Sequence, residues 1–433
     1  MERLISIAGI FIMLGIALAF SSNWRIIRWK IVAWGIGLQI LFALLILGVP
    51  AAGIPGVLQP LFQLASAVFN KVLSFTESGS VFVFGSLASS KDFGSVIFAF
   101  QILPTIIFFS ALMAIGYHLG IMQRIVKVMA LIMQKLMGTS GAETLSVSAN
   151  VFVGQTEAPL LIRPYVKDMT LSELMTVMVG GMATVSGGIM AAYVGMLNDR
   201  IPDIAGHLMT ASVMSAPAAL AIAKIMIPET ETPRTMGGVE IPIEKQDANV
   251  IEAAARGAGE GLTLAFNVAA MLLAFIALIF MVNYTLIFVG GKIGFANWGG
   301  FLVPEALRSA GPAQLSLELI FGWLFYPIAW SMGIPAHESA LAGIILGKKI
   351  VLNEIIAYGA MAQMQEQLSQ RTLIILSYAI CGFANFSSIA IQIGGIGGIA
   401  PSRRSDLARL GLRAVVGGSL AAFLTATIAG VML

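Results

Sequence analysis

Long stretches without a charged side chain are the feature that most constrains how this chain can fold. Seven of them approach or exceed the roughly 20 apolar residues that a helix needs to cross the hydrocarbon core of a membrane: residues 4–20, 31–49, 93–123, 204–223, 261–291, 372–402 and 414–433. Residues 171–197 also qualify, because their single charge, Glu173, lies at the start. We therefore expect an all-α integral membrane protein with eight transmembrane spans.

Composition excludes the other broad classes. Charged residues make up 11% of the chain and hydrophobic residues 58%, whereas soluble proteins carry about 25% charge. Disorder would require low hydrophobicity and high charge. A net charge of +3 is too small for a nucleic-acid partner, and the single cysteine, Cys381, excludes an internal disulfide and a cysteine metal cluster. No motif indicates a cofactor.

Lysine and arginine near the ends of the spans orient the chain, because cytoplasmic loops are enriched in them. Eight alternating spans place most of these clusters on one side: Arg25, Arg28, Lys30, Arg124, Lys127, Lys135, Arg163, Lys167, Lys224, Arg403, Arg404, Arg409 and Arg413. We expect this side to be cytoplasmic and both termini to be external.

The chain divides into four regions on this basis. Residues 1–92 hold the first two spans and an external loop, and residues 93–226 form a first half. Residues 227–260, the one extended polar stretch, are expected to be a cytoplasmic loop, and residues 261–433 form a second half.

Four segments break the apolar pattern. In the first half, residues 146–159 read SVSANVFVGQTEAP, with a polar tip between two apolar stretches, and residues 180–188 read GGMATVSGG inside a span. In the second half, residues 349–358 read KIVLNEIIAY and residues 382–388 read GFANFSS, again inside a span. Each half thus has a re-entrant helical hairpin, a broken span and a closing span, and the two halves have opposite orientations.

Inverted repeats with broken helices are typical of secondary transporters. Irregular backbone at membrane depth leaves unpaired amides and carbonyls, so it persists only where it lines a wet cavity or is buried in protein. Two hairpins that enter from opposite faces would bring their polar tips together near the midplane. An acidic side chain at such a depth is costly, which makes Glu157 and Glu354 candidates for binding substrate.

At these segments the sequence resembles the concentrative nucleoside transporter family over nearly the whole chain. The motifs that carry the resemblance are NVFVGQTEAP at 150–159, LNEI at 352–355 and CGFANFSSI at 381–389. The resemblance implies a homotrimer in the inner membrane, surrounded by lipid, whose protomers each have eight spans and two re-entrant hairpins. It also implies a sodium-driven symporter for uridine and related nucleosides rather than an enzyme.

The resemblance implies a role for each matching residue. Gln155, Thr156 and Glu157 would bind the nucleobase, and Gly154 would allow close approach of the backbone. Glu354, Asn385 and Ser388 would bind the ribose hydroxyls, and Phe383 and Ile189 would pack on the base. Sodium would be bound by the Asn150 side chain, the Thr184 hydroxyl, and the carbonyls of Val153 and Val185, an oxygen set that suits a hard cation.

Three alternatives stay open. Some members of the family use protons, and here Thr184 stands where the usual residue is serine, so a proton-coupled symporter is the first. The run Gly138-Thr139-Ser140-Gly141 fits the G-x-S-G pattern of intramembrane serine proteases, whose nucleophile needs a base; His118, His207 and His337 all lie outside the polar motifs. A passive channel would need pore-lining rings and no ion coupling.

Overall fold

The computed structural model describes residues 1–49, 53–89, 97–197, 201, 203–237, 247–303 and 313–433. In these ranges the chain is helical, with one isolated antiparallel bridge between Val49 and Ile54 and no strand. The α-helices are α1 (Glu2–Ala19), α2 (Trp29–Ile46), α3 (Gln59–Phe84), α5 (Phe98–Gln101), α6 (Leu103–His118), α7 (Ile121–Met137), α8 (Gly141–Ala149), α9 (Arg163–Val166), α10 (Leu171–Ala183), α11 (Gly187–Leu197), α12 (Ile204–Met226), α13 (Val250–Lys292), α14 (Phe295–Trp298), α15 (Leu317–Ser331), α16 (Ala336–Val351), α17 (Glu354–Met364), α18 (Gln370–Ile380), α19 (Phe386–Ile399) and α20 (Arg404–Met432). Short 3-10 turns connect several of them, including Ala158–Ile162 between α8 and α9.

Membrane-length helices account for most of the apolar stretches. Among the described residues, seven helical segments are long and apolar enough to span a membrane, or eight if the bent pair α15 and α16 counts as one span. These seven match seven of the eight predicted spans, although residues 93–96 of the third lie outside the described residues. The remaining predicted span, 372–402, is divided between α18 and α19, and neither half alone is long enough to cross.

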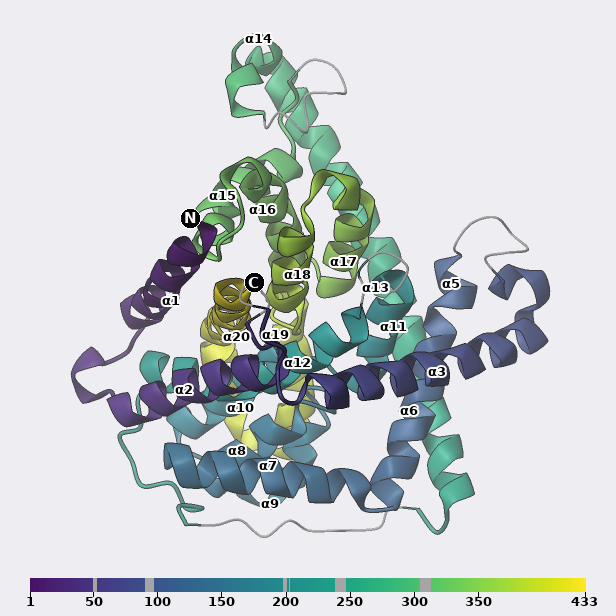
Figure 1. Cartoon of the computed structure of the whole chain (residues 1–433), viewed down its shortest axis with the longest axis vertical. Helices are drawn as coiled ribbons and strands as arrows, with labels where there is room; N and C mark the ends of the chain where they lie inside the picture. The colour runs from purple at the N-terminus through teal and green to yellow at the C-terminus, as the bar shows by residue number, and fades with distance from the viewer. Residues whose placement is uncertain (50–52, 90–96, 198–200, 202, 238–246, 304–312) are drawn as a thin grey trace.

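Two regions that the sequence analysis treated as loops contain helices. The predicted external loop within 1–92 holds the 26-residue helix α3, which runs across the molecule in Figure 1. The predicted cytoplasmic loop 227–260 ends earlier than expected, because α13 already begins at Val250. The loop boundary at 260 was therefore wrong.

Local interactions explain the early start of α13. The Asn249 side chain accepts a hydrogen bond from the Glu252 amide and so caps the helix. Arg256 pairs with Glu260 one turn later and binds Asp247 through two hydrogen bonds of 2.8 and 2.9 Å. The Arg256 guanidinium holds the pKa of Asp247 below its ordinary value. Polar residues that looked like loop therefore form the first turns of a helix.

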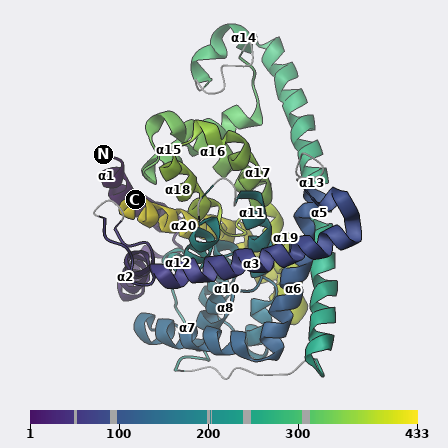
Figure 2. The ribbon, with the colours of Figure 1, turned by 45° about the vertical axis from the view of Figure 1, so that its right-hand side comes forward.

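The helices divide into a packed core and an exposed edge. In α12, α20 and the α10–α11 segment, 89% of the most apolar window is buried, whereas in α13 only 11% is buried. In Figures 1 and 2, α13 stands along one edge of the molecule with α6 beside it. Gly257 and Gly261 of α13 lie against the backbone of α6, where an added Cβ would come within 2.8 Å of it. These two helices form a pair beside the core.

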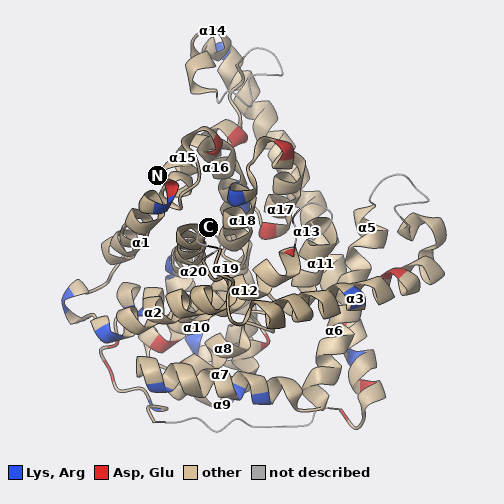
Figure 3. Ribbon diagram, viewed as in Figure 1, with Lys and Arg blue, Asp and Glu red and all other residues tan. Residues whose placement is uncertain are grey.

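Charge is distributed unevenly along the chain. Figure 3 shows lysine and arginine along α7 and in neighbouring segments, and fewer, scattered charges of both signs among the helices in the middle of the molecule. The two termini lie close together, since the Arg3 guanidinium donates a hydrogen bond to the Leu433 carbonyl at 2.6 Å. An even number of crossings would place the two ends together in this way.

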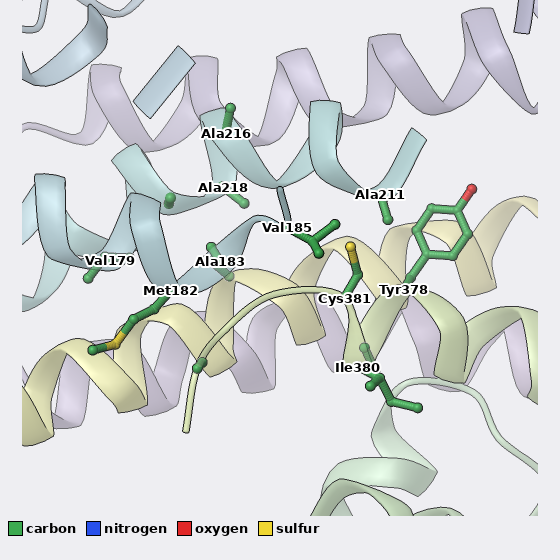
Figure 4. Close-up of a cluster of buried hydrophobic side chains, with 14 of the residues drawn as sticks. Val179, Met182, Ala183, Val185, Ala211, Ala216, Ala218, Tyr378, Ile380 and Cys381 are labelled. Carbon is green, nitrogen blue, oxygen red and sulfur yellow. The ribbon is translucent and has the colours of Figure 1, made fainter. Parts of the chain in front are cut away.

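All four predicted interruptions occur in the helices. α10 and α11 are separated at residues 184–186, and α18 and α19 at residues 381–385. α16 and α17 are separated at residues 352–353, and α8 ends just before the tip at 150–157. Gly382, at φ +115°, allows two of these breaks to touch, because a Cβ there would lie 2.7 Å from the Ala183 carbonyl. Figure 4 shows Ala183, Val185 and Cys381 in the same buried cluster.

A buried ionic cluster stabilises the ends of α8, α10 and α12. Lys224 lies 2.7 Å from Glu143 and 3.5 Å from Glu229, and it donates to the Ser172 hydroxyl at 2.9 Å. Ser140, the serine of the protease-like pattern, caps α8 and donates to Glu173 at 2.5 Å. Its hydroxyl thus has a structural role, as the cap of α8 and as a donor to Glu173 at the start of α10.

Lys224→Met should destabilise the protein strongly. Removing one partner of a buried charge pair leaves the other charge uncompensated, at a cost of about 3–5 kcal/mol of unfolding free energy. Thermal melting in detergent measures the effect. Lys135→Met, the same change at an exposed position of α7, is the control and should leave the melting temperature within error. Equal melting of the two variants would contradict the structural role of the cluster.

Candidate functional site

A cavity of about 2280 Å³ opens between the two halves of the chain. Its lining includes segments near the end of α8, the start of α11, the start of α17 and the break between α18 and α19. All nine residues that the sequence analysis predicted for substrate line it: Gly154, Gln155, Thr156, Glu157, Ile189, Glu354, Phe383, Asn385 and Ser388. Charged side chains also line it: Arg124, Lys127, Arg163, Lys167, Asp247, Arg256 and Glu260.

The tip of the first half is an irregular turn between α8 and the Ala158–Ile162 helix. Gly154 lets the Glu157 carboxylate lie against the backbone, because a Cβ at this position would displace that carboxylate. Glu157 itself is exposed to the cavity, whereas only 7% of Gln155 is exposed. Gly395 of α19 likewise has no side chain where Thr156 packs against it. The tip therefore presents an exposed acid and a nearly buried amide.

The tip of the second half is organised by two asparagine caps. Asn353 accepts from the Ile356 amide at 2.9 Å and starts α17, while Asn385 accepts from the Ser388 amide at 3.0 Å and starts α19. Because its oxygen is engaged by the cap, the Asn385 amide nitrogen points to Glu354, to which it donates at 2.9 Å. Glu354 is only 5% exposed. Its carboxylate keeps further lone pairs for other donors.

A hydrogen-bonded bridge links the two tips. The Gln155 amide nitrogen donates to the Ser388 hydroxyl at 3.1 Å, although the two residues are 233 positions apart. Gln392 of α19 donates to the Gln155 oxygen at 3.1 Å and to the Met178 carbonyl at 3.0 Å. The two halves of the chain thus supply opposite walls of one polar site.

The four residues predicted to bind sodium lie at the junction of the first tip and the α10–α11 break. The two segments are joined by the Gly187 amide, which donates to the Phe152 carbonyl at 3.0 Å. Asn150 is 1% exposed, and its side-chain oxygen has no hydrogen-bond partner among the described residues. Thr184, also 1% exposed, donates to the Gly180 carbonyl at 2.9 Å, which leaves its lone pairs available. Val153 lines the cavity and Val185 is fully buried.

A bound cation is one explanation for an unpaired buried acceptor. Buried polar atoms in native proteins nearly always have a partner, and each exception calls for an explanation such as an ion. The Asn150 oxygen and the Thr184 hydroxyl both fit sodium, which binds oxygen ligands without any titrating group. The donor set of this junction therefore suits the predicted ion.

Sequence reasoning missed three polar residues around the site. Gln392 is fully buried behind the cavity wall. Tyr117 of α6 lines the cavity and interacts electrostatically with Glu157. Lys349 of α16 is fully buried, lies 5.5 Å from the centre of the Phe423 ring and interacts electrostatically with Glu354. Gln392 and Lys349 could have been noticed as polar residues within or beside apolar runs.

The fold and the site together define a class. Membrane-length helices, interrupted in both halves around one polar cavity, are the construction of a secondary membrane transporter. Comparison with known families makes the assignment narrower. Three family models match the chain. Residues 8–87 match the model described as Na+ dependent nucleoside transporter N-terminus, and residues 99–200 match the model described as nucleoside recognition. Residues 207–430 match the model described as Na+ dependent nucleoside transporter C-terminus. The chain belongs to the concentrative nucleoside transporter family, so the resemblance seen in the sequence is confirmed.

Individual proteins agree with this assignment. The chain is 44% identical to an uncharacterized transporter of Haemophilus influenzae, covering 100% of this chain and 98% of that one. It is 39% identical to sodium/nucleoside cotransporter 1 of Rattus norvegicus, covering 100% of this chain and 64% of that protein. The structure matches that of CNTnw in an inward-facing substrate-bound state with a TM-score of 0.88 and 41% identity, over 100% of this chain and 98% of the other. The family transports nucleosides and is not a family of enzymes, which sets aside the protease alternative.

Proposed function

We propose that this protein is a secondary active importer of nucleosides driven by an inward sodium gradient. The observation that carries the proposal is the meeting of the two polar tips, one from each half, around a single cavity. A site made of two walls that belong to different repeats can open to one side of the membrane or the other. Its donors and acceptors match a small polar solute with hydroxyl groups at one end.

The substrate-binding roles follow from which wall each residue occupies. Gln155, Thr156 and Glu157 of the first wall bind the nucleobase, with Gly154 giving the backbone close access. On the second wall Glu354, Asn385 and Ser388 bind the ribose hydroxyls, since an ionised carboxylate accepts from two vicinal hydroxyls. Phe383 and Ile189 pack on the faces of the base. The sodium ligands are Asn150, Thr184, and the carbonyls of Val153 and Val185.

The membrane topology comprises eight spans and two re-entrant hairpins in an inverted repeat. The seventh span is α18 followed by α19, broken at the residues that face the cavity, and α20 is the eighth. The hairpins are α8 with its return through α9, and α16 with α17. The bond between Arg3 and the Leu433 carbonyl supports an even number of spans.

Orientation and assembly complete the proposal. Both termini are external and the polar segment 227–260 is cytoplasmic. The basic lining of the cavity is also cytoplasmic, so the cavity is inward-facing. In the inner membrane the protein forms a homotrimer through the exposed side of α13, where Phe266, Leu273 and Phe280 are 67–76% exposed. Lipid covers the apolar surface that the trimer leaves free.

Uptake into proteoliposomes tests the proposed function directly. Radiolabelled uridine should accumulate above its external concentration when an inward sodium gradient is imposed, and it should not accumulate under a proton gradient alone. Equilibration without accumulation in either gradient would identify a passive channel and overturn the proposal.

Substitutions on the two walls should affect selectivity differently. Gln155→Ala and Glu157→Ala should change the rank order of nucleobases, because they remove groups that face the base. Asn385→Ala and Ser388→Ala should weaken all ribonucleosides together, by about tenfold, since each removes a hydrogen bond on the ribose side. Competition by a nucleoside panel measures both effects. An unchanged base preference in both first-wall variants would remove these residues from base recognition.

A further inference from the structure

Gln392 is a polar residue that contacts the substrate site from behind. It lies in α19, one turn after Ser388, and it is fully buried. It does not line the cavity. Its amide nitrogen makes two hydrogen bonds, to the Met178 carbonyl of α10 and to the side-chain oxygen of Gln155. It therefore connects a backbone group in the core to a residue that faces the cavity.

The Met178 carbonyl determines the direction of each hydrogen bond in the series Met178, Gln392, Gln155 and Ser388. A backbone carbonyl can only accept, so the nitrogen of Gln392, and not its oxygen, must face Met178. The second hydrogen of that nitrogen then requires an acceptor, which fixes the Gln155 oxygen toward Gln392. As a result the Gln155 nitrogen points the other way, to Ser388 in the cavity wall. The orientation of an amide that could otherwise rotate by 180° is thus set.

Two further features concern how Gln392 is accommodated: one of its polar atoms is unpaired, and a glycine leaves space for it. The oxygen of Gln392 has no hydrogen-bond partner among the described residues, although it is buried. An orphaned buried acceptor is unfavourable. Gly181 makes room for the pair, because a Cβ at this position would lie 2.8 Å from the Gln392 nitrogen and 2.9 Å from the Gln155 Cβ. The packing of α10 therefore accommodates this bridge.

We propose that Gln392 is a positioning residue that determines base selectivity by making Gln155 present its N–H donor to the cavity. This inference rests on the proposed role of Gln155 in base recognition. A fixed donor favours bases with an oxo group at the position it reaches and disfavours bases with an amino group there. Uridine has an oxo group where cytidine has an amino group, and inosine and adenosine differ in the same way. These two pairs of nucleosides therefore report the preference.

Gln392→Met tests the inference with a side chain of similar size that has no donor. The Gln155 amide then becomes free to rotate, so the preference for oxo over amino bases should be lost. Measured as the KM for cytidine divided by the KM for uridine, this preference should fall toward one. The expected change in the ratio is about tenfold, the equivalent of one net hydrogen bond. Gln39→Met is the matched control. Gln39 is equally buried, but it bonds within α2 and to Thr425, so the ratio should not change.

Gln392→Glu gives a second, stronger readout, because it should reverse the preference. A buried carboxyl group is favoured in its neutral form. It can donate its one proton to the Met178 carbonyl and accept from the Gln155 nitrogen, which turns the Gln155 oxygen toward the cavity. The Ser388 hydroxyl can donate to that oxygen as readily as it accepts from the nitrogen. Cytidine and adenosine should then be preferred over uridine and inosine.

The Gln155→Ala variant separates the possible failures. If Gln392 acts through Gln155, then Gln392→Met has no further effect on the KM ratio in the Gln155→Ala background. A ratio that still shifts in that background, or uniform weakening of all four nucleosides by Gln392→Met, overturns the inference while the role of Gln155 stands. A base preference that Gln155→Ala leaves unaltered overturns the proposed role of Gln155 itself.

Discussion

Glu354→Gln should reduce nucleoside uptake by about 100-fold, because the substitution replaces charge-assisted hydrogen bonds by neutral ones on two ribose hydroxyls at once. The buried carboxylate already accepts from Asn385 at 2.9 Å. A glutamine oxygen can keep that bond, so the wall of the site should remain in place. What is lost is the negative charge that a vicinal diol binds.

Two measurements separate this loss of binding from a loss of folding. Calorimetry in detergent should show uridine affinity lowered in the same proportion as uptake, and the melting profile should stay cooperative. Glu366→Gln, the same change at an exposed position of the same half, should leave uptake intact. Glu354→Asp is a second variant, which keeps the negative charge beside the buried Lys349. Its shorter side chain should bind uridine more weakly. Wild-type uridine affinity in Glu354→Gln would remove Glu354 from the site.

Asn150→Leu should abolish the sodium dependence of uptake together with most of the transport. The Asn150 side-chain oxygen is buried without a partner at the junction where sodium is proposed to bind. Leucine has the same branched shape and no oxygen, so it removes a ligand without opening a cavity. Uptake measured against external sodium, with choline as the replacement ion at fixed pH, should become flat.

Two threonines, Thr176 within α10 and Thr184 directly after its last residue, provide a matched control for the ion site. Thr184 and Thr176 are both buried and both donate to the carbonyl one turn earlier, at 2.9 Å. Thr184→Val should raise the sodium concentration needed for half-maximal uptake by about tenfold, whereas Thr176→Val should not change it. Full uptake in choline, driven by an inward proton gradient, would instead establish a proton-coupled transporter in which Asn150 and Thr184 are packing residues.

The sequence by itself determined the helical membrane class and the positions where the helices break. The length of an apolar run can be read from a single segment of the sequence. A single apolar segment can span lipid only as a helix, because a helix satisfies its own backbone hydrogen bonds there. The breaks are local too, since Thr184, Ser186 and Gly382 interrupt apolar runs where the helices end. The nine substrate residues were predicted from the family resemblance of the motifs at these breaks, and all nine line the cavity.

Only the tertiary structure decided which of these groups meet and in which direction they bond. Gln155 and Gln392 are 237 positions apart, and no pattern within either segment specifies their contact. The buried position of Lys349, the helix α3 within an apparent loop and the unpaired oxygen of Asn150 likewise depend on what other segments pack nearby. Hydrogen-bond direction is a property of a whole network, and here it is set by a backbone carbonyl, Met178, that carries no signal in the sequence.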